Sequence, residues 1–134
     1  MDDRRDENNP AEMILAEETY ALVGAAMDVY YRLGTGFLEP VYQQALAIEL
    51  KLRNIPFRPQ GRFQIEYKGH FLEKEYVADF VCFDQIIVEI KALNQLSPVD
   101  WSQILNYLKV SKLRVGLLFN FGSNGRLEWK KLVI

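Results

Sequence analysis

The fold is decided by residues 77–92, which read VADFVCFDQIIVEIKA. Two strongly apolar runs, 77–83 and 86–92, flank the pair Asp84-Gln85. This pattern predicts two neighbouring strands joined by a tight turn. Three charged residues stand inside the apolar runs, namely Asp79, Glu89 and Lys91. Because burying an unpaired charge is costly, these residues need either partners or a chemical task.

The length of the turn decides whether the three charges share one face of the sheet. Glu89 and Lys91 are two residues apart and must point to the same side. A two-residue loop that pairs residue 83 with 86 would put Asp79 on the opposite side. A three- or five-residue loop, which pairs 83 with 87 or 82 with 88, gathers all three charges. It also leaves a second face that is entirely apolar, made by Phe80, Cys82, Val88, Ile90 and Ala92. We expect the odd loop because the polar atoms then find one another.

The residue types in this predicted cluster point to metal chemistry. Two carboxylates that converge on a strand pair make an oxygen-rich site for a hard cation such as Mg²⁺. An adjacent lysine ammonium can hold an attacking water or a phosphate oxygen. The alternative is a structural buried ion pair of Lys91 with Glu89 or with Asp79.

Two further groups of residues are candidates for the same site. A helix is expected from Pro98, with Ser97 as its N-cap and Asp100 reaching back. On it Gln103 and Tyr107 are four residues apart and share a face. Their amide and phenol can bond phosphate oxygens or orient a lysine, although a tyrosine at such a position more often packs in the core.

Glu39 lies at the start of another predicted helix, after the turn-forming Gly36. The helix dipole favours a carboxylate at this position, so capping and a functional role are both open for Glu39. Tyr42, one turn further on, is expected in the core.

The remaining pattern completes an α/β fold. A first helix is predicted from Pro10 to Leu33 and a second one to about Arg53, with an apolar stripe at Leu38, Val41, Ala45, Ile48 and Leu52. A strand near 63–68 follows, a turn at 68–70, and a strand that resumes near Phe71. After the third helix come strands at 115–119 and 127–133. We therefore expect a mixed β-sheet flanked by helices, a tail over residues 1–10 that is disordered or frayed, and one domain over residues 11–134.

Composition excludes several classes of protein. The 134 residues are 49% hydrophobic and 25% charged, which is ordinary for a globular domain. A net charge of −2 does not suit a protein that coats nucleic acid by bulk charge. With one cysteine and one histidine, the chain has neither a disulfide framework nor a His/Cys zinc site. No apolar run reaches the ~18 residues of a membrane span, so we expect a cytoplasmic protein without membrane association.

At these residues the chain resembles the GxxExxY family, whose name describes Gly36-x-x-Glu39-x-x-Tyr42. The similarity runs from about residue 22 to 121 and includes GFLEPVY, ALAIEL, EYVADFV, VEIKA and QILNYL in order. This family is a compact branch of the PD-(D/E)xK nuclease superfamily. One departure is Ala78, which stands where the superfamily name has proline.

The resemblance implies a restriction-endonuclease-like core of helix, three antiparallel strands, helix and strand, which fits within the order ααβββαββ that the pattern predicts. It implies that Asp79 is the motif aspartate, that Glu89 and Lys91 are the (D/E)xK pair, and that Glu39 is a carboxylate supplied by the first core helix. Gln103 and Tyr107 match the QxxxY element of RecB-type nucleases. The implied metal ligands are Glu39, Asp79 and Glu89, and the implied cofactor is Mg²⁺ or Mn²⁺.

We therefore expect a metal-dependent nuclease that hydrolyses phosphodiester bonds of nucleic acid, DNA before RNA, and we leave room for a homodimer. The alternative is a catalytically silent module with the same fold that binds nucleic acid or protein. A third candidate is a metal hydrolase that acts on a small phosphate ester.

Overall fold

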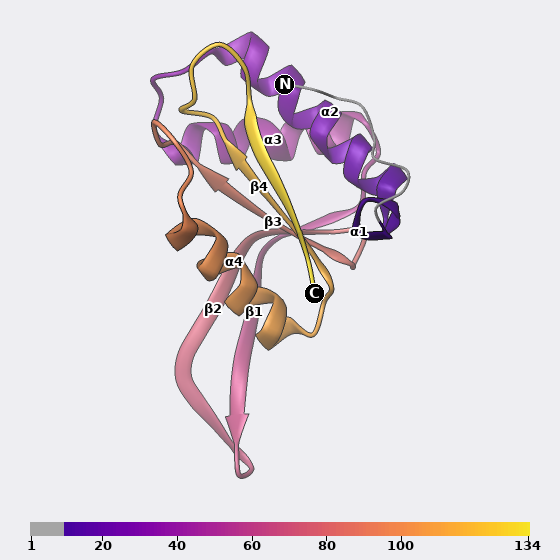
Figure 1. Cartoon of the computed structure of the whole chain (residues 1–134), viewed down its shortest axis with the longest axis vertical. Helices are drawn as coiled ribbons and strands as arrows, with labels where there is room; N and C mark the ends of the chain where they lie inside the picture. The colour runs from indigo at the N-terminus through magenta and orange to yellow at the C-terminus, as the bar shows by residue number, and fades with distance from the viewer. Residues whose placement is uncertain (1–9) are drawn as a thin grey trace.

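Residues 10–134 are described by the computed structural model, and their elements follow the expected order except that the first helix is split. Figure 1 labels these elements along the chain. Their bounds are α1 Pro10–Met13, α2 Ala16–Leu33, α3 Glu39–Leu52, β1 Phe57–Tyr67, β2 His70–Cys82, β3 Ile86–Lys91, α4 Pro98–Ser111, β4 Val115–Asn120 and β5 Glu128–Val133. The predicted tail, apart from Pro10, lies outside the described residues.

The split in the first helix occurs at Leu15, whose φ of 51° is left-handed. A left-handed residue cannot continue an α-helix, so the expectation of one continuous helix from Pro10 is wrong. The Lys131 ammonium on β5 donates a hydrogen bond to the Ile14 carbonyl at 2.6 Å. This contact satisfies one carbonyl that the interrupted helix leaves free. Within residues 10–134, no helix has the length and apolar character needed to cross a bilayer.

The five strands form one mixed sheet in the order β1-β2-β3-β4-β5. Only β3 and β4 run parallel, and the connection between them passes through α4. The other neighbours are antiparallel. The predicted α/β fold with a mixed sheet flanked by helices is thereby confirmed.

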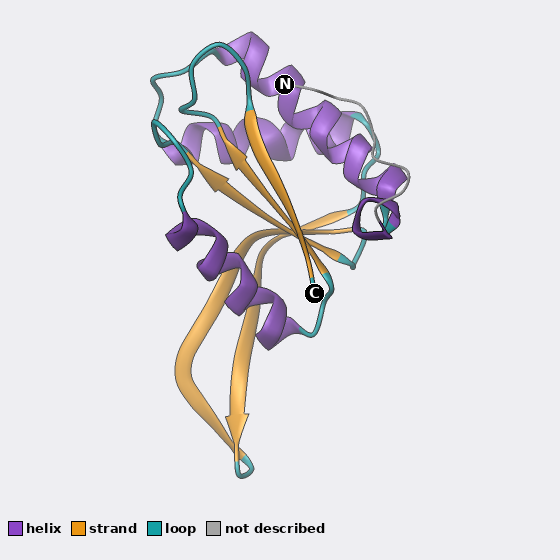
Figure 2. Cartoon of the chain, viewed as in Figure 1, coloured by secondary structure: helices purple, strands orange, loops and turns teal. Residues whose placement is uncertain are grey.

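Helices cover both faces of the sheet, so the core has two layers (Figure 2). On one side α2 and α3 pack over Phe80, Cys82, Val88 and Ile90, which are four of the five residues predicted to form the apolar face. On the other side α4 packs over Val81, Ile87 and Leu118. There is no room for a side chain between α4 and β4, since a Cβ on Gly116 would lie 2.7 Å from Ile104 Cδ1.

Helix α3 buries a different face from the one its apolar stripe predicted. Tyr42, Leu46 and Leu50 are buried, whereas Leu38 and Ile48 of the predicted stripe are 78% and 61% exposed. The Tyr42 ring stacks on Phe121 at 4.7 Å between centroids. Helix α3 offers two apolar stripes, and the fit against the sheet selects the one that contains Tyr42.

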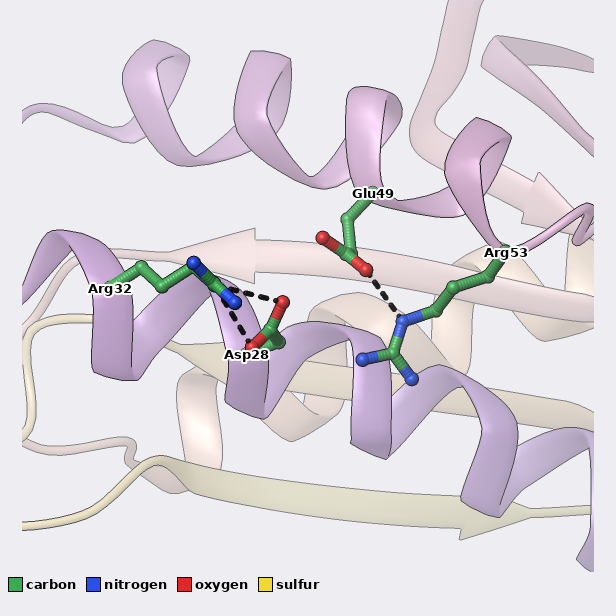
Figure 3. A network of polar contacts seen from close by, with 4 residues as sticks. All are labelled: Asp28, Arg32, Glu49 and Arg53. Atoms are coloured by element: carbon green, nitrogen blue, oxygen red, sulfur yellow. Dashed lines mark hydrogen bonds and ion pairs between the residues drawn. The ribbon is translucent and has the colours of Figure 1, made fainter.

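Two polar pairs face each other where α2 crosses α3 (Figure 3). Arg32 binds Asp28 at 3.1 Å on α2, and Arg53 binds Glu49 at 2.6 Å on α3. Both pairs have the i,i+4 spacing that brings side chains together on a helix. The Arg53 guanidinium reaches α2 itself, because it lies 3.3 Å from the position that a Cβ on Gly24 would take.

The loop between β3 and α4 is anchored by hydrogen bonds to two polar side chains of β4 and β5. Asn120, at the end of β4, accepts the backbone N–H of Leu93 at 2.8 Å and donates to Glu128 at 2.9 Å. Glu128 in turn accepts the N–H of Leu96 at 2.9 Å. Two polar side chains therefore hold the segment that follows Lys91 and leads into α4.

Gly122 provides a specific test of this anchoring. A Cβ on Gly122 would lie 2.4 Å from the Leu93 carbonyl oxygen, a backbone atom that cannot rotate away. We expect Gly122→Ala to lower the free energy of unfolding by about 1–3 kcal/mol, the usual cost of overpacking, in urea titrations. The matched control is Gly24→Ala, whose new Cβ meets only the flexible end of Arg53. Equal stability of Gly122→Ala and the wild type would contradict the close approach.

Candidate active site

The turn between β2 and β3 has an odd number of residues, as expected. Cys82 pairs with Ile86 and Phe80 with Val88, which encloses the three residues 83–85. This register differs by two residues from the predicted one, which paired 83 with 87 and 82 with 88. It keeps the predicted sides, because the same register continued places Asp79 opposite Glu89. The left-handed φ values of 55° and 54° at Phe83 and Asp84 make this tight turn.

The two carboxylates interlock at the place where the ladder between β2 and β3 stops. The N–H of Asp79 donates to Glu89 Oε1 at 3.1 Å. The N–H of Ile90 donates to Asp79 Oδ2 at 2.8 Å. Each strand therefore satisfies a backbone donor of its neighbour with a side chain. The structure brings Asp79 and Glu89 together, as the turn geometry predicted.

Burial makes this carboxylate pair hard to ionise. Glu89 is only 5% exposed, and burial together with the charge of Asp79 raises the pKa of Glu89 to about 9. Burial also raises the pKa of Asp79, although the hydrogen bond from Ile90 counteracts the shift. Two acidic groups in contact cannot both ionise easily, because the two negative charges would repel each other. A cation beside them would stabilise the ionised forms.

Lys91 lies on the same side of β3 as Glu89 but bonds to a neutral partner. Its ammonium donates to Gln103 Oε1 on α4 at 2.9 Å. Within residues 10–134, no ion pair of 4.0 Å or less joins Lys91 to Asp79 or Glu89. This arrangement disfavours the alternative of a structural buried ion pair.

Tyr107 lies one turn after Gln103 and is both a core residue and a neighbour of the carboxylates. It is buried, and its ring meets the edge of Tyr76 at 5.5 Å between centroids. Burial, then the charges of Glu89 and Asp79, raise the pKa of Tyr107 to about 12. The phenol therefore stays protonated near neutral pH and can donate a hydrogen bond toward the site.

Glu39, the first residue of α3, lies within electrostatic range of the pair but not in contact with it. Partial desolvation raises the pKa of Glu39, while Lys91 lowers it and Asp79 raises it further. Within the described residues 10–134, no three His, Cys, Asp or Glu side chains lie close enough together to hold a metal ion. The structure thus groups Asp79 with Glu89 and leaves Glu39 nearby.

The turn before Glu39 is held by Tyr42. The Tyr42 hydroxyl donates to the Gly34 carbonyl at 2.6 Å and accepts the N–H of Phe37 at 3.2 Å. Gly36, between these two residues, has a φ of +107°, which favours glycine. The glycine and the tyrosine of the Gly36-x-x-Glu39-x-x-Tyr42 motif therefore shape the turn from which Glu39 projects.

Gln43 is a site residue that the sequence analysis did not identify. Its side-chain amide donates to Asp79 Oδ1 at 3.4 Å, so α3 contacts β2 directly. The available signal was its position four residues after Glu39, which puts both side chains on one face of α3.

Asp79 and Glu89 supply adjacent carboxylate oxygens, which Mg²⁺ and Mn²⁺ prefer. Glu39 lies close enough to interact electrostatically with Asp79, but it does not complete a group of three ligands within residues 10–134 as they lie here. Burial is the largest cause of the raised pKa of both carboxyl groups, and a cation bound beside them would favour their ionised forms.

Comparison with known proteins agrees with this geometry. The model of the PD-(D/E)XK nuclease superfamily matches residues 16–132, and the chain therefore belongs to that superfamily. No curated protein matches the chain. Among solved structures, the crystal structure of SSO0001 is similar in fold, with a TM-score of 0.55 and 18% sequence identity over 70% of this chain. The chain covers about half of that protein, 48% of its length.

The raised pKa of Glu89 predicts a pH dependence for the metal-free protein. The unfolded chain releases this proton near the ordinary glutamate pKa of 4.5, whereas the pKa in the folded chain is about 9, so the folded state binds more protons between these values. Stability must then fall as the pH rises through this window, by up to about 1.4 kcal/mol per pH unit. Urea titrations with chelator at several pH values measure this slope.

Glu89→Gln should flatten the pH dependence, because glutamine resembles the protonated carboxyl in shape and charge. The control is Glu17→Gln, which changes an exposed carboxylate in the first turn of α2 and should keep the slope. A metal-free wild type whose stability rises between pH 6 and pH 8 would contradict the burial of a protonated Glu89.

Proposed function

We propose that this chain is a divalent-metal-dependent nuclease that hydrolyses phosphodiester bonds of nucleic acid, DNA before RNA. The observation that carries the proposal is the interlocked Asp79–Glu89 pair beside Lys91, which makes no ion pair with a carboxylate of residues 10–134. Membership of the PD-(D/E)XK nuclease superfamily supports the same reaction. Within it, the Gly36-x-x-Glu39-x-x-Tyr42 motif supports assignment to the GxxExxY group. The cytoplasmic location and the homodimer stay predictions.

In this proposal Asp79, Glu89 and Glu39 would hold Mg²⁺ or Mn²⁺. When bound, the ion supplies positive charge for the phosphate oxygens and lowers the pKa of water. The ammonium of Lys91 offsets the charge that develops on the scissile phosphate and orients the attacking water by a hydrogen bond. Gln103 positions Lys91 without cancelling its charge. Tyr107 stays protonated and can donate a hydrogen bond to a phosphate oxygen or steady Lys91.

The test is an incubation of wild type and Lys91→Ala with single- and double-stranded substrates, in Mg²⁺, in Mn²⁺ and in chelator. We expect metal-dependent cleavage by the wild type and a loss of about 10²–10³-fold in Lys91→Ala, the usual effect of removing one charge stabiliser. Lys51→Ala, on exposed α3 surface, is the matched control and should cleave normally. If the wild type binds nucleic acid and leaves it intact in both metals, the silent module is the correct description.

Glu39 can be tested as a metal ligand separately from its position at a helix start. A divalent ion that binds only the folded state stabilises it by ~2.7 kcal/mol at a hundredfold excess over Kd. We expect Glu39→Gln to shrink the rise in Tm that Mn²⁺ produces. The free energy of unfolding without metal should change only by the effect of a helix-end charge, about 0.3–1 kcal/mol. Glu17→Gln is the control. An undiminished response to Mn²⁺ in Glu39→Gln would return Glu39 to a capping role.

A further inference from the structure

Strands β1 and β2 continue beyond the sheet as a two-stranded arm, which we define as residues 61–78. The ladder between β2 and β3 begins at Phe80, whereas that between β1 and β2 runs on to the pair Tyr67–His70. Figure 1 shows the arm projecting past α4. A two-stranded ribbon alone is marginally stable in water, so an arm of this length needs a further reason to exist.

A cavity of about 480 Å³ lies between this arm and α4. The arm contributes Phe71, Tyr76 and Glu66 to its wall, and the α4 side contributes Asn106, Lys109 and Lys112. Phe71 is 67% exposed, although it is a large apolar side chain. Its exposure is unexplained by core packing and places an aromatic face at the cavity.

The chemistry of the wall combines aromatic faces with positive charge. The lining contains two exposed lysines, Lys109 and Lys112, and one acidic residue, Glu66. A third ammonium, that of Lys74, lies 5.6 Å from the centroid of the Tyr76 ring. Aromatic rings that stack on bases, set among lysines that bind phosphates, are the usual surface for single-stranded nucleic acid.

Residues that line the cavity are neighbours of residues in the candidate active site. Tyr76 lines the cavity and packs edge-on against Tyr107, the neighbour of Glu89 and Asp79. On α4, Gln103 binds Lys91 and Asn106, three residues later, lines the cavity. Residues three apart share a helix face, so one face of α4 runs from the site to the cavity.

We propose that the cavity between the arm and α4 binds the unpaired nucleotides next to the phosphodiester bond at Asp79, Glu89 and Lys91. This inference rests on the proposed nuclease function and specifies its substrate as a single strand. A volume of about 480 Å³ falls in the range of pockets that enclose small molecules, about 300–1,000 Å³. Single nucleotides belong to that size class, whereas a duplex is far larger.

Binding in the absence of metal tests the proposal independently of cleavage. The probe is a fluorescent oligothymidylate of about a dozen nucleotides, and the competitor is a blunt duplex of the same length, both in chelator. We expect anisotropy titrations to show tighter binding of the single strand. Phe71→Ala should weaken this binding by about 5- to 100-fold, the effect of losing one stacked base. Because Phe71 is exposed, its truncation should leave the Tm unchanged.

The salt dependence tests the two lysines. For single strands, log K decreases with log salt, and the steepness of this decrease is reduced by about 0.7 for each phosphate contact that is lost. The double variant Lys109→Gln/Lys112→Gln should therefore make the slope less negative by about 0.7–1.4. Lys51→Gln on α3 is the control and should keep both affinity and slope. Wild-type affinity in Phe71→Ala and an unchanged slope in the double variant would overturn the proposal, as would equal binding of the duplex.

The two proposals fail in different ways. If the wild type cleaves nothing but its single-strand binding depends on Phe71 and on the lysines, the cavity assignment stands and the nuclease function is wrong. If the wild type cleaves a single strand and the cavity variants bind and cleave it as well as the wild type does, the cavity assignment alone is wrong.

Discussion

The structure depends on the exchange of hydrogen bonds between Asp79 and Glu89 at the point where β2 leaves β3. The N–H of Asp79 and the N–H of Ile90 would both lose their partners when the strands separate, and the two carboxylates replace those partners. The separation lets β2 bend away with β1 as an arm, and it opens the sheet edge to α3 and α4. The same two side chains thus serve the backbone and form the acidic pair, because satisfying the two backbone donors requires the carboxyl groups to lie side by side, where burial and their mutual repulsion disfavour ionisation of both.

Each element that carries a site residue also carries a core residue next to it. On α4, Ile104 packs on Gly116 while Gln103, its neighbour in the chain, binds Lys91. On α3, Tyr42 stacks on Phe121 while Gln43 binds Asp79. The rigid packing of one side chain therefore fixes the position of the other. Preorganisation of this kind is what a site for charge stabilisation needs, since it avoids reorganisation during the reaction.

Much of the fold and of the site could be predicted from local pattern. The order of elements follows from the change between a 3.6-residue and a two-residue hydrophobic period. The odd turn and the apolar face opposite Asp79 follow from period-two alternation, which has only two outcomes for each strand. The predicted partner of each residue on β2 lies two positions too far along β3, because a register shift of two residues keeps every side chain on the same face of the sheet. The choice between the two apolar stripes of α3 could not be made, because it depends on where Tyr42 meets Phe121, a contact between distant parts of the chain.

The missed residue Gln43 and the arm have a similar explanation. Gln43 is a polar residue on a helix, and its function is visible only once α3 is placed against β2. The alternation at Phe63, Ile65 and Tyr67 predicts a strand with one buried face, but it does not say that the strand extends beyond the sheet. Register and neighbours of this kind are set by packing between elements, so no window of the sequence contains them.

The neutral partner of Lys91 has a physical consequence. In the proposed function the phosphodiester substrate is an anion, and it would approach two acidic groups whose raised pKa values already show that negative charge is disfavoured there. An acidic residue at position 103 would form an ion pair with Lys91 and cancel the positive charge that the chain itself supplies there. Gln103 holds the ammonium at 2.9 Å by an oxygen without net charge, so the lysine is positioned and keeps its full charge for the substrate. In the proposed function the ammonium of Lys91 would face a phosphate beside the Asp79–Glu89 pair, and a divalent cation would supply the further positive charge that lets both carboxyl groups ionise.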